Sequence, residues 1–368
     1  MKRLAIVTAV LITVTSVFNF AYADDKSTYT LDEAIEYAES NDYGLKALDA
    51  EVKKAQTNFS KEARNRKLYR DTLAGAEFTV DTGFAAALYK NGYMLETAEM
   101  SLNIAKRNYE AGKNELKNNV RQSFYSYLIS KSKRENLERS LEHANELKSF
   151  ADLKEKNGQI SKLDLQSFEL NVMDAQIKLS AQKRAEELSL DSLKNTMSYP
   201  AEGTLVPVGK VELCEMDKTP VEDALKLAEN HTSMKNNEES YQNAKKKFAI
   251  AKAWYSSAQL DYSIEKAEFS KAENTYYKNK SSILLGVKSA YNMMLSSYET
   301  LDYLNARAGY VNSMAEVSKL RYDMGQITAS DYISAVNGIY ELNTTIDETK
   351  LQAVNSVYNY RMTFTYDN

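Results

Sequence analysis

The sequence predicts a mainly all-α protein of long antiparallel helical hairpins, and three observations lead to this fold class. Apolar residues recur at spacings of three and four over long stretches, which is the pattern of coiled-coil seams. All three prolines lie between Pro200 and Pro220, so the flanking stretches lack this helix breaker. Two similar segments, NGQISKLDL from Asn157 and MGQITASDY from Met324, interrupt those stretches. Since only 43% of residues are apolar, a thin or hollow helical structure is favoured over a solid globular core.

The first 23 residues have the features of a cleaved export signal. Lys2 and Arg3 precede an apolar stretch, and Ala21-Tyr22-Ala23 provides the small residues that a signal peptidase accepts. A retained membrane anchor is the alternative, but polar residues interrupt the apolar stretch. We therefore expect residues 1–23 to be a signal peptide and the mature protein to be exported.

Composition and charge argue against several classes of protein. Removal of residues 1–23 takes away two basic residues and no acidic one, so the mature charge is 45 minus 51, or −6, which disfavours nucleic acid as a partner. Cys214, the only cysteine, cannot form an internal disulfide and lies too far from the cleavage point for a lipid anchor. The only histidines, His143 and His231, have no second ligand at metal spacing. No phosphate loop or activated nucleophile is recognisable, so we expect no enzyme, cofactor or metal.

The chain is predicted to contain two copies of one unit, joined at the proline cluster. TLDEAIEYAESN from Thr30 is similar to TPVEDALKLAEN from Thr219 at an offset of about 190 residues, whereas the later segments correspond at about 167. The first copy thus has about 23 additional residues between its first and second helices. The predicted organisation is a first repeat over 24–199, a proline-containing linker over 200–219 and a second repeat over 220–368.

Each repeat is predicted to contain three helical segments. In the first repeat they cover residues 31–68, 95–156 and 162–197. Their counterparts in the second repeat cover about 221–255, 260–323 and 329–362. The middle helix is close to twice as long as its neighbours, so the first and third helices stacked end to end would match it.

The third helix of the first repeat carries two apolar seams. One seam contains Val172 and Leu179, and the other contains Leu170, Met173 and Ile177. Two seams on one helix predict a neighbouring helix on each side, and helices with two neighbours can close into a ring.

The two glycine-containing segments are predicted to be the tips of helical hairpins. Gly158 and Gly325 stand where the long helix must stop, because glycine accepts the left-handed conformation of a helix C-cap. Ser161 and Thr328 can then cap the following helix. Capping does not explain why both tips also share a Gln-Ile pair, which is expected to place an exposed apolar residue in each tip.

With these features the chain resembles the TolC-type family of outer-membrane efflux proteins. The residues that carry the resemblance are LDEAIEYAESNDYGLKALDAEVKKA, at 31–55, and the two tips in their corresponding places. The resemblance implies a homotrimeric helical tunnel in the cell envelope, outer membrane or periplasm, which exports small molecules or proteins. It also implies that the tips dock a periplasmic adaptor (membrane fusion) protein that works with an inner-membrane pump. The candidate partner-binding residues are Gly158, Gln159, Ile160, Ser161, Gly325, Gln326, Ile327 and Thr328.

The resemblance further implies an entrance gate near the second tip. Tyrosine contacts and acidic rings close the entrance in the family, so Tyr322 and Asp331 are gate candidates, with Asp164 at the equivalent place in the first tip. The pattern is incomplete, because Ser334 stands where a second acid is expected and Ile327 replaces a basic residue. A ring of Asp331 carboxylates could still favour cations electrostatically.

The chain departs from the family at its membrane end. Members insert two strands between the first and second helices of each half, and a spanning strand needs about 9–11 residues. Residues 254–262 leave room only for a turn, while 75–92 are either one short strand or a soluble loop or hairpin. We therefore expect at most a short β segment near 75–92, a candidate membrane contact there, and a rudimentary or absent membrane barrel.

Two other functions are open to such a sequence. A non-conducting helical scaffold of the cell envelope would use the same hairpins to hold a partner, and the reduced membrane end favours it. The adaptor subunit itself is disfavoured, because the β-rich modules that flank an adaptor hairpin have no counterpart here.

Overall fold

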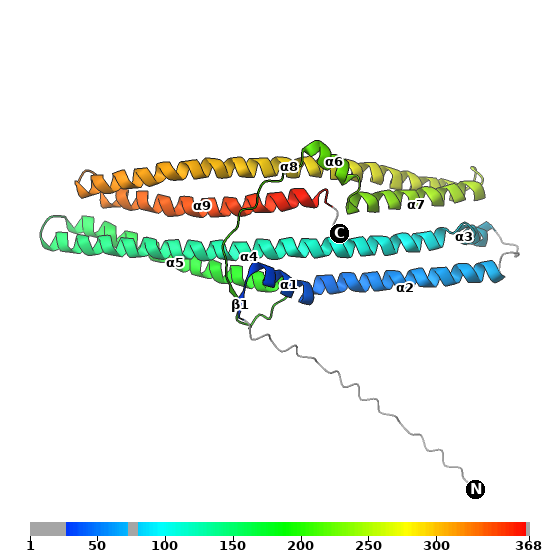
Figure 1. Cartoon of the computed structure of the whole chain (residues 1–368), viewed down its shortest axis with the longest axis horizontal. Helices are drawn as coiled ribbons and strands as arrows, with labels where there is room; N and C mark the ends of the chain where they lie inside the picture. Colours follow the sequence, from blue (N-terminus) through cyan, green and yellow to red (C-terminus); the bar gives the residue numbers. More distant parts are fainter. Residues whose placement is uncertain (1–26, 73–79, 366–368) are drawn as a thin grey trace, which may run out of the picture.

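The computed structural model describes residues 27–72 and 80–365, so the predicted signal peptide lies outside the described residues. Long helices run lengthwise through an elongated molecule (Figure 1). Only two strands, each of two residues, occur in the described part. The predicted class, a helical body of long hairpins, is therefore confirmed. Within the described ranges, no helix combines the length and apolar content needed to span a bilayer.

The helices of the first half stack along one long helix. They are α1 (Leu31–Asn41), α2 (Tyr43–Thr72), α3 (Val80–Lys90), α4 (Tyr93–Lys156) and α5 (Lys162–Thr196). The 64-residue α4 packs on α5 near one end and on α1 and α2 toward the other. Two shorter stretches thus match one long helix, as the relative lengths predicted.

The single helix predicted over 31–68 is interrupted at Asp42, which corrects that prediction. The backbone of Asp42 is extended (φ −58°, ψ 130°), and the Asp42 carboxylate accepts a hydrogen bond from the Leu45 backbone N–H at 2.7 Å. An aspartate in this conformation caps a new helix start. The chain therefore ends α1 and restarts as α2 without a loop.

The second half repeats the arrangement. Its helices are α6 (Val221–Ala228), α7 (Thr232–Trp254), α8 (Leu260–Asp323) and α9 (Ala329–Met362). The helix predicted over 221–255 is also divided, because His231 accepts a hydrogen bond from the Ser233 backbone N–H at 3.3 Å and caps α7. The 64-residue α8 packs on α7 and α9, as α4 packs on α2 and α5.

The β segment considered for residues 75–92 is not found over Val80–Lys90, which form α3. Phe84 and Leu88 are four residues apart and lie on one helix face, where they pack in a buried cluster with Ile250 of α7. Tertiary packing thus selects a helix for a pattern that also suited a strand. The earlier part of the segment, 73–79, lies outside the described residues.

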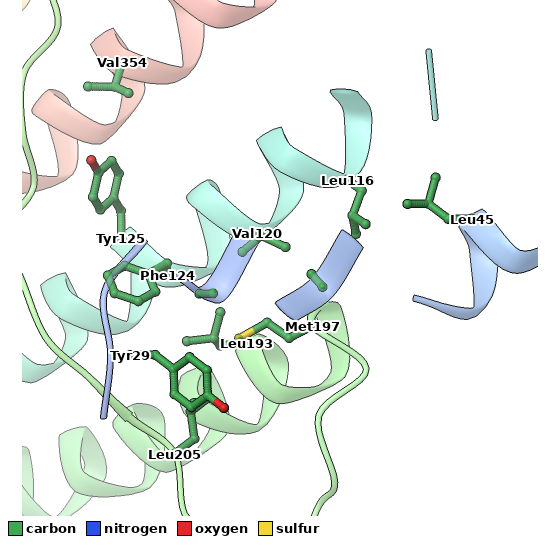
Figure 2. Close-up of a cluster of buried hydrophobic side chains, with 12 residues drawn as sticks. Tyr29, Leu45, Leu116, Val120, Phe124, Tyr125, Leu193, Met197, Leu205 and Val354 are labelled. Carbon is green, nitrogen blue, oxygen red and sulfur yellow. The ribbon is translucent and has the colours of Figure 1, made fainter. Parts of the chain in front are cut away.

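The linker between the halves crosses α4 as an extended chain. Its strand β2 (Val206–Pro207) pairs in parallel with β1 (Thr28–Tyr29) at the start of the first half. Beside this pair, Leu193 and Met197 at the end of α5 are fully buried in a cluster with Phe124 of α4 (Figure 2). This cluster joins the first half, the linker and α9 in the middle of the molecule.

Candidate functional site

The two predicted hairpin tips have the same backbone geometry and lie at the same end of the molecule (Figure 1). Gly158 has φ +70° and Gly325 has φ +72°, the left-handed conformation that glycine adopts at low cost. No neighbouring atom lies within 4 Å of where a Cβ would stand on either glycine. The requirement for glycine is therefore conformational and does not come from crowding.

Both tips continue into a reciprocal helix cap. The Ser161 hydroxyl accepts a hydrogen bond from the Asp164 backbone N–H at 3.1 Å, and the Asp164 carboxylate accepts one from the Ser161 N–H at 2.9 Å. Thr328 and Asp331 form the same reciprocal cap: the Thr328 hydroxyl accepts a hydrogen bond from the Asp331 N–H at 3.1 Å, and the Asp331 carboxylate accepts one from the Thr328 N–H at 3.2 Å. Hydrogen bonds from the Ser161 side chain and backbone lower the pKa of Asp164. Two of the three gate candidates, Asp164 and Asp331, thus act as caps within the chain, and their gate role stays a prediction.

The side chains at the tips differ from the expectation in one respect. Ile160 and Ile327 are half-buried, although an exposed apolar residue was expected in each tip. The apolar residues that are well exposed are their neighbours, Leu163 (75%) and Met324 (63%). The shared glutamines, Gln159 and Gln326, are exposed.

The third gate candidate, Tyr322, lies in an aromatic cluster between the two halves. Its ring stacks on Tyr332 of α9 with centroids 5.3 Å apart, and the Lys154 ammonium of α4 lies 5.7 Å from its centroid. His143 of α4 packs edge-on against Tyr332. Burial, with a smaller contribution from Asp323, raises the pKa of both tyrosines. Sequence reasoning missed these partners: Tyr332 lies across the hairpin tip from Tyr322, and Lys154 and His143 come from α4 in the other half of the chain.

Outside the tips, the polar residues that suggest chemistry serve helix packing. No three His, Cys, Asp or Glu side chains in the described part come together in a way that could hold a metal ion. His231 caps α7, and the hydroxyl of Tyr298 donates a hydrogen bond to the carbonyl of Cys214.

The order of the helices leaves two outer edges. α4 contacts α7 and α9 of the second half, and α8 lies on the far side of that pair (Figure 1). The helices α2 and α5 lie on the other side of α4. α8 therefore forms one edge of the molecule, and α2 stacked with α5 forms the opposite edge.

Both edges carry an exposed apolar seam in the half near the tips. On α5, Val172 and Leu179 of the first predicted seam are buried, whereas the second seam faces solvent. The exposed α5 side chains are Leu163 (75%), Leu170 (64%), Met173 (55%) and Ile177 (66%). On α8 they are Tyr303 (61%), Tyr310 (66%), Val317 (49%) and Met324 (63%), each seven residues after the last. Seven-residue spacing keeps side chains on one face for another helix to cover.

Comparison with known proteins identifies the fold. No family model matches the sequence. No curated protein matches it either. Solved structures do match: a membrane protein from Pseudomonas aeruginosa has a TM-score of 0.74 at 12% identity, covering 91% of this chain and 93% of that one. The CmeC outer membrane channel of Campylobacter jejuni has a TM-score of 0.70 at 13% identity, covering 91% of this chain and 85% of that one.

The VceC outer membrane protein of Vibrio cholerae matches with a TM-score of 0.73 at 10% identity, covering 91% of this chain and 95% of that one. These matches extend over nearly the whole length of both chains. The chain thus has the fold of TolC-type outer-membrane channels, which confirms the predicted resemblance at the level of the fold.

Proposed function

We propose that this chain is a TolC-like component of an efflux or secretion channel. In this proposal three copies close a helical tunnel in the cell envelope, and the hairpin tips dock a periplasmic adaptor and pump that export small molecules or proteins. The fold shared with outer-membrane channels supports the tunnel. The observation that carries the proposal is the pair of exposed apolar seams on the two outer edges.

The seams suit contact between copies of the chain. A ring brings the α8 edge of one copy against the α5 edge of the next, because α4, α7 and α9 already have neighbours on both sides. Full burial of one Leu or Ile side chain contributes about 1.5–3 kcal/mol. Eight side chains along the two seams therefore provide a strong driving force for assembly near the tips.

Light scattering coupled to size-exclusion chromatography tests the assembly. We expect the mature chain to elute as a trimer and a Leu170→Asp/Ile177→Asp variant to elute as a monomer, because a charge cannot be buried in an apolar seam. The matched control, Phe150→Asp/Leu153→Asp, places the same two charges on exposed apolar positions of α4 (60% and 55%), which is not at either edge, and should remain trimeric. A monomeric wild-type protein at high micromolar concentration would refute the tunnel.

Adaptor docking is tested at the tips. A charged side chain at Ile160 or Ile327 should weaken adaptor binding and export together, whereas Leu227→Asp, at a 48% exposed position on α6 away from the tips, should affect neither. Thermal melting of each variant checks that the hairpins remain folded.

The alternative function is a non-conducting helical scaffold of the cell envelope. The helical conformation of Val80–Lys90, where a membrane strand was considered, is the observation that favours it. Export that is unaffected by the Ile160 and Ile327 substitutions would support the scaffold over the channel.

A further inference from the structure

The end of the molecule opposite the tips carries a concentrated positive charge. The final part of α2, α3, the final part of α7 and the start of α8 meet there (Figure 1). Residues 61–69 of α2, 245–254 of α7 and 260–264 of α8 together contain eight Lys and Arg and two Asp and Glu, whereas the whole chain contains 47 and 51. Because the whole chain has a formal charge of −4, this end has the opposite sign from the rest.

Helix stability explains part of this charge but leaves an excess. Lys246 pairs with Glu96 of α4, and Lys247 pairs with Glu265 of α8. Cations near the end of a helix are also favoured by its dipole. However, several other cations are exposed and make no ion pair with a carboxylate in the described ranges. They are Lys61, Arg64, Lys67 and Lys252.

Exposed apolar side chains lie at the same end. Leu260 is 82% exposed and Ile264 is 59% exposed, and their spacing of four places them on one face of α8. Trp254, 39% exposed, ends α7 just before them, and Leu68 of α2 is 60% exposed. Tryptophan and aliphatic side chains among lysines are typical of surfaces that rest in the headgroup region of a bilayer.

We propose that this basic end, formed by residues 61–68, 245–254 and 260–264, binds the surface of a membrane that contains anionic lipids. Its cations meet the headgroup phosphates, while Trp254, Leu260 and Ile264 enter the interface. Within the contact predicted at residues 75–92, Phe84 and Leu88 of α3 are buried, so the proposed surface is formed by the neighbouring residues of α2, α7 and α8. The proposal does not require the tunnel, since one copy carries the whole surface.

Vesicle co-sedimentation of the mature chain tests the proposal. We expect binding to phosphatidylcholine vesicles that contain about 30 mol % phosphatidylglycerol, and at least about tenfold weaker binding to phosphatidylcholine alone. Raising the salt from about 0.05 M to about 0.5 M should weaken the binding to anionic vesicles, because salt screens exposed charges.

Two variants with the same chemistry at opposite ends separate this surface from general effects. Lys67→Glu/Lys252→Glu/Leu260→Asp changes the basic end, and Lys156→Glu/Lys162→Glu/Leu163→Asp changes the tip end. Leu260 and Leu163 are comparably exposed, at 82% and 75%. We expect at least about a tenfold loss of binding in the first variant and less than about a twofold change in the second, with unchanged helicity in both.

Three results would overturn the proposal: no binding to anionic vesicles, equal binding to both vesicle types, or equal loss in the two variants. The first would point to an acidic protein as the partner of this end. Light scattering on the same samples keeps the two proposals apart, because a monomer that binds anionic vesicles retains the membrane surface and refutes the tunnel.

Discussion

The half of the molecule near the tips and the opposite half join their helices in different ways. Near the tips, α8 packs on α9 through an apolar cluster around Leu301 and Leu342, and α4 meets α9 through the aromatic contact of His143 with Tyr332. In the opposite half, α4 meets α7 through polar groups: Arg107 binds both Glu239 and Asn236 of α7.

The part of the molecule near the tips and the part far from them also differ at their outer edges. The α5 edge exposes apolar residues at heptad spacing, whereas the α2 edge exposes mainly charged residues such as Lys53, Lys54 and Lys61. Apolar seams drive association with little dependence on salt, while exposed charges contribute little to stability and are screened. We therefore expect assembly between copies to be concentrated near the tips, which leaves the opposite half free to meet a charged partner.

The largest expected effect on folding is a cavity in the tip half. Leu301 is 2% exposed in the α8–α9 cluster, so Leu301→Ala should lower the free energy of unfolding by about 2–5 kcal/mol. Met293→Ala, at a 58% exposed position of the same helix, should change it by less than about 0.5 kcal/mol. Urea titrations at low and high salt should give the same loss for Leu301→Ala. A loss that disappears in high salt would contradict apolar packing as its cause.

The opposite half should respond less, and with salt dependence. Arg107 is 21% exposed and donates to Glu239 at 2.9 Å and to Asn236 at 2.7 Å, so Arg107→Met should cost about 1–2 kcal/mol of unfolding free energy. The cost should shrink as salt is added. Lys53→Met removes only the exposed pair with Asp49, which solvent screens, so its cost should be much smaller. Equal costs for both variants would show that the α4–α7 contact adds nothing beyond a surface pair.

The sequence predicted the long helices well, because seams and glycine stops repeat over many residues. It missed the interruptions at Asp42 and His231, since a single capping residue leaves the apolar period almost unchanged. It predicted a short strand, a loop or a hairpin around Val80–Lys90 and missed the helix α3, because that helix depends on packing against Ile250, distant in sequence. For the same reason it found Tyr322 but not Lys154 of α4, which lies beside that ring.

Substitution of the tip glycines should have a smaller effect on the unfolding free energy, and a glycine inside α8 provides the comparison. An alanine at Gly158 or Gly325 should lower the unfolding free energy by about 1 kcal/mol, because both adopt the left-handed conformation while space for a Cβ is open. Gly286 lies inside α8 with equally open space, so Gly286→Ala should raise the unfolding free energy by up to about 1 kcal/mol. Thermal melting measures both signs. Destabilisation by all three alanines would show that crowding, and not backbone conformation, determines the outcome.

The smallest expected effect concerns the cap of the first tip. Hydrogen bonds from Ser161 lower the pKa of Asp164, so the folded state favours the carboxylate more than the unfolded state does. The stabilisation is present above the ordinary Asp pKa of about 4 and is lost as the pH falls through the lower folded value. Asp164→Asn should therefore reduce the melting temperature at neutral pH, and the difference should shrink as the pH falls below about 4. A difference that persists at the acidic end would show that the carboxylate charge is not the stabilising feature, and that the cap depends on the shape of the side chain alone.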